Sequence, residues 1–144
     1  MTSPTTDDHF RLEFSSEPDF ISTARLFAGA AARYYGCDED AVQDVKIAIS
    51  EACTNAVKAH ESAFVAMPVR VVVRPASSSI FFEVIDSGGG FEHAAGNGEQ
   101  TPELDPMVEN GIGLHIIQAL FPDTEVGPNT EGGTTVRFSV PRTA

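Results

Sequence analysis

Three polar side chains in the segment EACTNAVK have the spacing of one helix face. Glu51 and Asn55 are four residues apart, and Lys58 follows three residues later. In a helix they lie within about 60° of one another. An amide oxygen can join phosphate oxygens as a ligand of Mg²⁺, and a carboxylate one turn away can accept the proton of an attacking hydroxyl. A solvated polar helix face is the alternative interpretation of this pattern alone.

A second candidate is the segment 86–91 (DSGGGF), which directly follows an expected strand. Glycine has no side chain, so Gly88 and Gly90 allow the backbone to come close to a ligand. Asp86, at the end of the strand, can accept a hydrogen bond from an exocyclic amine. A plain glycine turn is the alternative.

Two further glycine segments lie at the starts of expected elements. In NGIGLHII, Gly111 and Gly113, followed by Leu114, lie where a loop enters a helix. Unpaired N–H groups and the positive end of the helix dipole favour a phosphate there. In GGTTVRF, Thr134 offers a hydroxyl beside two glycines at the start of the last strand. Taken alone, both patterns also occur at ordinary helix starts and hairpin turns.

The hydrophobic periodicity predicts the elements that position these residues, in the order β-α-α-β-β-loop-α-β-β. Ser16 is predicted to cap the first helix, which ends at Gly36, and Asp38 to open the second. This order indicates an α+β fold: a two-layer α/β sandwich whose mixed, mostly antiparallel sheet is covered by helices on one face. Strands are expected at 9–15, 69–74, 80–86, 124–126 and 134–140, and a helix at 111–121.

The length of 144 residues predicts one domain. Residues 1–8 are predicted to be a flexible tail, and 9–144 the folded domain. The long segment 87–110 is rich in glycine and acidic residues, and a loop of this length is typical of a functional or a disordered segment. We expect it to form a lid.

The net charge of −12 argues against direct binding to nucleic acid or to an anionic membrane surface, because both interactions rely on Lys and Arg. No apolar run approaches the roughly 20 residues that span a bilayer, and the polar N-terminus does not resemble a signal peptide. A cytoplasmic location is expected.

Cys37 and Cys53 are expected to be buried or half-buried free thiols. The histidines are predicted to lie at the surface or in loops: His9, His60, His93 and His115.

Together and in this order, the four segments resemble the boxes of the GHKL ATPase superfamily, which has the Bergerat ATP-binding fold and includes the catalytic domains of histidine kinases. The resemblance spans residues 10–141. Within the superfamily, the segment DVKIAISEACTNAV and the final Gly-Thr-Thr-Val strand look like the stand-alone anti-sigma serine kinases, the RsbW-like and SpoIIAB-like proteins.

The resemblance implies a role for each candidate residue. Asn55 would bind Mg²⁺, and Glu51 would be the general base. Asp86, with Gly88 and Gly90, would bind adenine. The remaining residues would contact the phosphates or close on the nucleotide: Lys58, Gly111, Gly113, Leu114 and Thr134.

The resemblance also implies an activity and partners. The protein would bind Mg-ATP, phosphorylate a serine of a STAS-type anti-anti-sigma protein, bind a sigma factor and form a homodimer. An alternative is a non-catalytic ATP-binding module that regulates a partner by nucleotide-dependent binding. The absence of Lys and Arg from residues 92–110 favours this alternative, because relatives often carry an Arg near the third box.

Overall fold

The computed structural model describes residues 9–89 and 111–142. The predicted tail, 1–8, lies outside the described residues. Most of the predicted lid, 90–110, also lies outside them, and with it Gly90 and His93.

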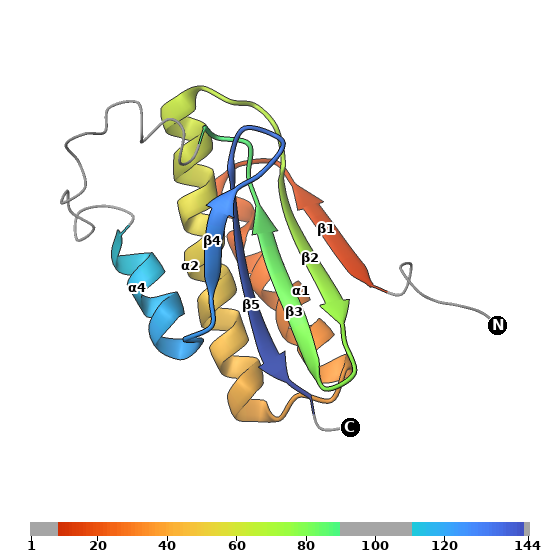
Figure 1. Ribbon diagram of the computed structural model, residues 1–144. Coiled ribbons are helices and arrows are strands. Elements are labelled where there is room, and N and C mark those ends of the chain that lie inside the picture. Colours follow the sequence, from red (N-terminus) through yellow and green to blue (C-terminus); the bar gives the residue numbers. More distant parts are fainter. Residues whose placement is uncertain (1–8, 90–110, 143–144) are drawn as a thin grey trace.

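Five strands form a single sheet in the order β1-β2-β3-β5-β4 (Figure 1). All four neighbouring pairs are antiparallel. The sheet, predicted to be mixed and mostly antiparallel, is therefore antiparallel throughout the described residues. The strands are β1 (Phe10–Phe14), β2 (Val69–Pro75), β3 (Ser79–Ile85), β4 (Glu125–Pro128) and β5 (Thr134–Pro141).

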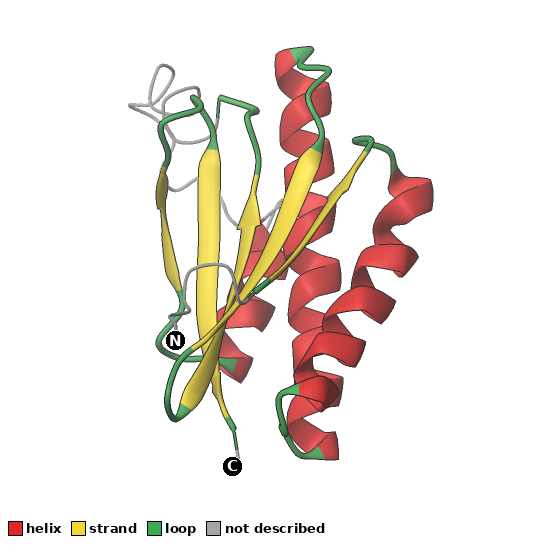
Figure 2. Cartoon of the chain, turned by 90° about the vertical axis from the view of Figure 1, so that its right-hand side faces the viewer, coloured by secondary structure: helices red, strands yellow, loops and turns green. Residues whose placement is uncertain are grey.

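The α-helices of the described residues lie on one face of this sheet, which gives two layers (Figure 2). The predicted α+β sandwich is thus confirmed. None of these helices is long and apolar enough to cross a membrane. The helical elements are the 3-10 turn η2 (Pro18–Phe20) and the α-helices α1 (Ile21–Tyr34), α2 (Glu39–Ala63) and α4 (Gly111–Leu120).

The core forms where the inward face of the sheet meets the apolar side of α2. In β2, Val71 and Val73 are fully buried, and their β3 partners Val84 and Phe82 are buried opposite them. Ile49 of α2 is also fully buried in this cluster. Removal of such surfaces from water stabilises the fold by about 25 cal/mol per Å² of apolar area. This packing fixes which side of α2 faces away from the sheet.

The two predicted helix starts have different outcomes. Asp38 caps α2 as predicted, because its side chain accepts the N–H of Ala41 at 2.9 Å. The predicted cap at Ser16 is wrong. The 3-10 turn η2 precedes α1, so α1 begins only at Ile21, and the buried Oγ of Ser16 has no hydrogen-bond partner among the described residues.

Candidate functional site

The carboxylate and the amide predicted on α2 face the first turn of α4. A Cβ atom added to Gly113 would lie 2.8 Å from Oε1 of Glu51 and 3.4 Å from both Oδ1 and Nδ2 of Asn55. Gly113 is buried, and the two α2 residues are half-buried. A residue without a side chain therefore allows the N-terminal turn of α4 to approach both polar groups.

The polar face of α2 carries three side chains that could bind a ligand. No hydrogen bond or ion pair joins the side chain of Glu51, Asn55 or Lys58 to another described residue. Lys58 is exposed, one turn after Asn55. On the opposite side of the helix, Ile49 and Cys53 are fully buried. The predicted division of α2 into a polar face and an apolar face is confirmed.

Asp86 is a buried carboxylate that directly follows β3, with 7% of its surface exposed. Its Oδ1 accepts the N–H groups of Gly88 at 2.9 Å and Thr134 at 3.2 Å. Burial raises the pKa of this carboxyl group, and the two N–H donors offset part of that effect. Because both bonds end on Oδ1, Oδ2 is the oxygen that can accept a hydrogen bond from a ligand.

Two glycines allow close backbone contacts around Asp86. A Cβ on Gly88 would lie 2.7 Å from the carbonyl carbon of Ala59 in α2. A Cβ on Gly133 would lie 2.0 Å from the main-chain oxygen of Asp86. Real Cβ atoms do not come this close to backbone atoms, so both contacts depend on glycine. The turn after β3 is thus held between α2 and the start of β5.

His60 is a buried residue of α2, so its predicted surface position is wrong. Only 1% of it is exposed, and its Nε2 accepts the N–H of Ser87 at 2.8 Å. A neutral imidazole that accepts at Nε2 carries its proton on Nδ1. That atom has no partner among the described residues.

The burial of His60 could have been predicted from the sequence. Its helical spacing from Ala56 and Val57 places it on the inward side of an amphipathic helix. His115 is exposed, as predicted.

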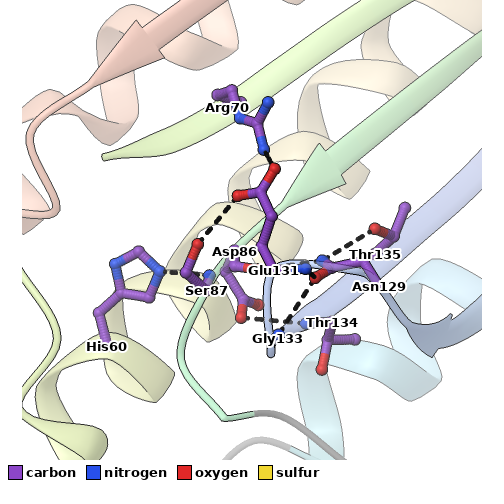
Figure 3. Close-up of polar contacts among 9 residues, drawn as sticks. All are labelled: His60, Arg70, Asp86, Ser87, Asn129, Glu131, Gly133, Thr134 and Thr135. Atoms are coloured by element: carbon purple, nitrogen blue, oxygen red, sulfur yellow. Dashed lines mark hydrogen bonds and ion pairs between the residues drawn. The ribbon is translucent and has the colours of Figure 1, made fainter. Parts of the chain in front are cut away.

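The turn between β4 and β5 contributes residues that the motifs did not single out (Figure 3). Glu131 forms an ion pair with Arg70 of β2 and accepts the hydroxyl of Ser87 at 3.1 Å. Asn129 donates from Nδ2 to the main-chain oxygen of Asp86 at 3.0 Å. The sequence NTEGG predicts a turn, but nothing in it indicates contact with a residue 43 positions earlier.

The structure brings the predicted residues together in two groups. One holds Glu51, Asn55 and Gly113, and the other holds Asp86, Gly88 and the half-buried Thr134. Gly111 begins α4, and Leu114 packs against the core from the same helix. Both groups border α2. Ala59, which contacts Gly88, is eight residues after Glu51, a rise of about 12 Å.

The donor set near α2 suits a cation that is shared with a ligand. No group of three or more His, Cys, Asp or Glu side chains able to hold a metal ion occurs in residues 9–89 and 111–142. Asn55 offers one amide oxygen, close to the start of α4. Mg²⁺ is commonly held by one or two protein oxygens together with phosphate oxygens and waters, and the available residues fit that mode.

A buried carboxylate at the end of β3 and a glycine-containing helix start, both bordering α2, are the features of a nucleotide-binding α+β domain. The family model described as a histidine kinase-like ATPase domain matches residues 14–140. The chain therefore belongs to the family of histidine kinase-like ATPase domains, within which it is a relative of the RsbW serine-protein kinases. This membership confirms the predicted family and makes ATP the ligand that the fold implies.

Named relatives and a solved structure agree with this assignment. The chain is 31% identical to the serine-protein kinase RsbW of Bacillus pumilus, over 93% of this chain and 86% of that protein. It is 28% identical to RsbW of Bacillus subtilis, over 92% and 84%. These relatives class the chain as a serine kinase. A crystal structure of RsbU and RsbW domains from Mycobacterium tuberculosis matches with a TM-score of 0.67 at 22% identity, covering 98% of this chain and 34% of that one, and supports the fold.

Proposed function

We propose that this protein binds Mg-ATP and phosphorylates a serine of a STAS-type anti-anti-sigma protein, and that it binds and withholds a sigma factor. The observation that carries the proposal is the approach of Glu51 and Asn55 to the start of α4, where a Cβ on Gly113 would lie 2.8 Å from the Glu51 carboxylate. This proximity of a carboxylate, an amide oxygen and a helix start supports their proposed roles as proton acceptor, metal ligand and phosphate site.

The adenine base binds at Asp86 in this proposal. Oδ2 accepts a hydrogen bond from the exocyclic amine, while the N–H groups of Gly88 and Thr134 hold Oδ1. The bound base lies beside the part of α2 near Ala59, and the phosphates extend along α2 toward Glu51. Gly88 lets the backbone approach the base.

The phosphates bind where α4 begins. Gly111, Gly113 and Leu114 supply N–H groups at the positive end of the helix. Asn55 supplies an amide oxygen to Mg²⁺, which neutralises phosphate charge when it is bound. Lys58 contacts a phosphate, and Thr134 closes on the nucleotide through its hydroxyl.

Glu51 accepts the proton of the substrate serine as that hydroxyl oxygen attacks the γ-phosphorus and the bond to ADP breaks. No described residue engages the carboxylate, so it is available to the substrate. Catalysis then depends mainly on holding the serine in line with the γ-phosphate, and general-base help contributes about 10²–10⁴-fold.

A single substitution in α2 tests this role. Glu51→Ala is expected to bind ATP with a dissociation constant within about threefold of wild type, and to transfer phosphate at least about 100-fold more slowly. Calorimetry measures the binding, and transfer of labelled γ-phosphate to a purified STAS-type protein measures the rate. Asp44→Ala, on the same face seven residues earlier, is the matched control and retains activity. Transfer by Glu51→Ala at the wild-type rate would exclude Glu51 as the base.

A non-catalytic ATP-binding module is the second candidate function. The observation that favours it is a sequence without Lys or Arg from 92 to 110, which offers no side-chain cation to the γ-phosphate. In that case wild type and Glu51→Ala would bind the partner equally in the presence of ATP, and neither would transfer phosphate.

The homodimer and the cytoplasmic location also belong to this proposal. Leu26 and Tyr34 of α1 are 64% and 73% exposed, which leaves apolar surface for a second copy. Light scattering of the purified protein tests the dimer, and a monomer at micromolar concentration would contradict it.

A further inference from the structure

The side-chain amide of Asn129, in the turn between β4 and β5, forms hydrogen bonds through both its oxygen and its nitrogen (Figure 3). Its Oδ1 accepts the N–H of Glu131 at 2.8 Å and the N–H of Gly133 at 3.1 Å. Its Nδ2 donates to the main-chain oxygen of Asp86 at 3.0 Å and to Oγ1 of Thr135 at 3.2 Å. All the donors and acceptors of this amide group therefore have at least one partner.

The orientation of this amide is fixed by its neighbours. Two main-chain N–H groups point at Oδ1, and a carbonyl oxygen accepts from Nδ2. A rotated amide would place donors against donors at Glu131 and Gly133, and an acceptor against the carbonyl of Asp86. Aspartate has no donor to offer that carbonyl, and alanine can form none of these bonds.

The network leads from Asn129 to the carboxylate of Asp86 by a short route. Gly133, whose N–H is held by Asn129, is followed by Thr134, whose N–H binds Oδ1 of Asp86 at 3.2 Å. The main chains of Asp86 and Thr134 are also joined by a hydrogen bond of 3.0 Å. The Asn129 amide thus fixes both the main chain of Asp86 and the donor that orients its carboxylate.

We infer that Asn129 is a positioning residue that sets the base specificity of the nucleotide site through Asp86. This inference rests on the proposed function, in which Oδ2 of Asp86 binds the exocyclic amine of adenine. Discrimination between bases depends on the placement of that oxygen, because a poorly placed acceptor rejects a wrong base less strongly. Loss of the Asn129 amide releases the turn and lets the carboxylate move.

The experiment compares ATP with inosine triphosphate, which carries a keto oxygen in place of the amine. Competition binding gives the ratio of the two dissociation constants for wild type, Asn129→Ala and Asn129→Asp. Wild type is expected to prefer ATP by more than about tenfold, and both variants by about threefold or less. Asn129→Asp keeps an acceptor for the two N–H groups of the turn and removes the Nδ2 donor to Asp86 and Thr135, so it remains informative where Asn129→Ala fails to fold.

Thr135→Val is the matched control, because it removes the second acceptor of the Asn129 amide and leaves the bond to Asp86. Its ratio is expected to equal that of wild type. An unchanged ratio in Asn129→Asp would overturn the inference, as would an equal loss of discrimination in Thr135→Val. Failure of wild type to bind ATP at all would instead contradict the proposed function, so the two failures are distinguishable.

Discussion

At Asp86, the requirements of ligand binding and of folding oppose each other. The carboxylate is placed to accept a hydrogen bond from a base, but 93% of the residue's surface is removed from water. Burial raises the pKa of this carboxyl group because the charged form loses hydration, and the N–H groups of Gly88 and Thr134 compensate only partly. In the absence of ligand, the ionised carboxylate therefore destabilises the folded state.

Asp86→Asn is expected to remove this cost. A carboxyl group whose pKa is higher in the folded state contributes stability below its unfolded pKa of about 3.9, and this contribution is lost as pH rises through the folded pKa. The variant is therefore expected to melt at or above the temperature of wild type at pH 7, with the difference shrinking as the pH falls toward 4. It is also expected to bind ATP at least about tenfold more weakly.

Thermal melts of both proteins between pH 4 and pH 7, with calorimetric ATP titrations at pH 7, measure these effects. A variant that is less stable than wild type at pH 7 would show that the ionised carboxylate contributes more through its hydrogen bonds than it loses through burial. Unchanged ATP affinity would remove Asp86 from the nucleotide site.

Individual residues were predictable where their chemistry is local. The spacing of Glu51 and Asn55 on one helix face follows from the helical period, and a carboxylate at a strand end before glycines identified Asp86. His60 and Asn129 could not be assigned in this way. Their partners, Ser87 and the main chain of Asp86, are 27 and 43 residues distant, and only the packing of the sheet brings them together.

At the level of elements, the β4–β5 hairpin offers a matched pair of glycines. A Cβ on Gly133 would lie 2.0 Å from the main-chain oxygen of Asp86, whereas a Cβ on Gly127 would meet nothing within 4 Å. Gly133→Ala is therefore expected to lower the free energy of unfolding by about 1–3 kcal/mol and to weaken ATP binding, because the hairpin must move away from Asp86. Gly127→Ala is expected to be close to neutral. Urea denaturation of the two variants tests the contrast, and equal stabilities would contradict it.

The element order was predictable because the first and last strands alternate, the two middle strands are rich in Val, Ile and Phe, and the first two helices each have an apolar stripe. The predicted strand at 134–140 corresponds to β5 at Thr134–Pro141. The order of strands in the sheet was not predictable. β5 pairs with β3 although α4 and β4 lie between them in the chain, and this pairing places Thr134 beside Asp86.

For the whole molecule, the net charge affects the association of the protein with ATP. The protein carries a net charge of −12, and ATP without a metal is itself strongly anionic. Long-range repulsion between them opposes association, and Mg²⁺ reduces it by neutralising phosphate charge. Among the described residues, no cluster of acidic or histidine side chains could retain the metal alone. The metal and the nucleotide are therefore expected to bind together.

This coupling predicts how ligand and metal removal change stability. Mg-ATP at 100 times its dissociation constant is expected to raise the free energy of unfolding by about 2.7 kcal/mol, while ATP with EDTA at the same concentration raises it less. Mg²⁺ alone is expected to have little effect. Asn55→Ala is expected to reduce the difference between Mg-ATP and ATP with EDTA, because the amide oxygen no longer holds the metal. Denaturant melts under these conditions measure all four effects.

Equal stabilisation of wild type with and without Mg²⁺ would show that the protein binds ATP independently of the metal. A full magnesium effect in Asn55→Ala would place the metal away from Asn55.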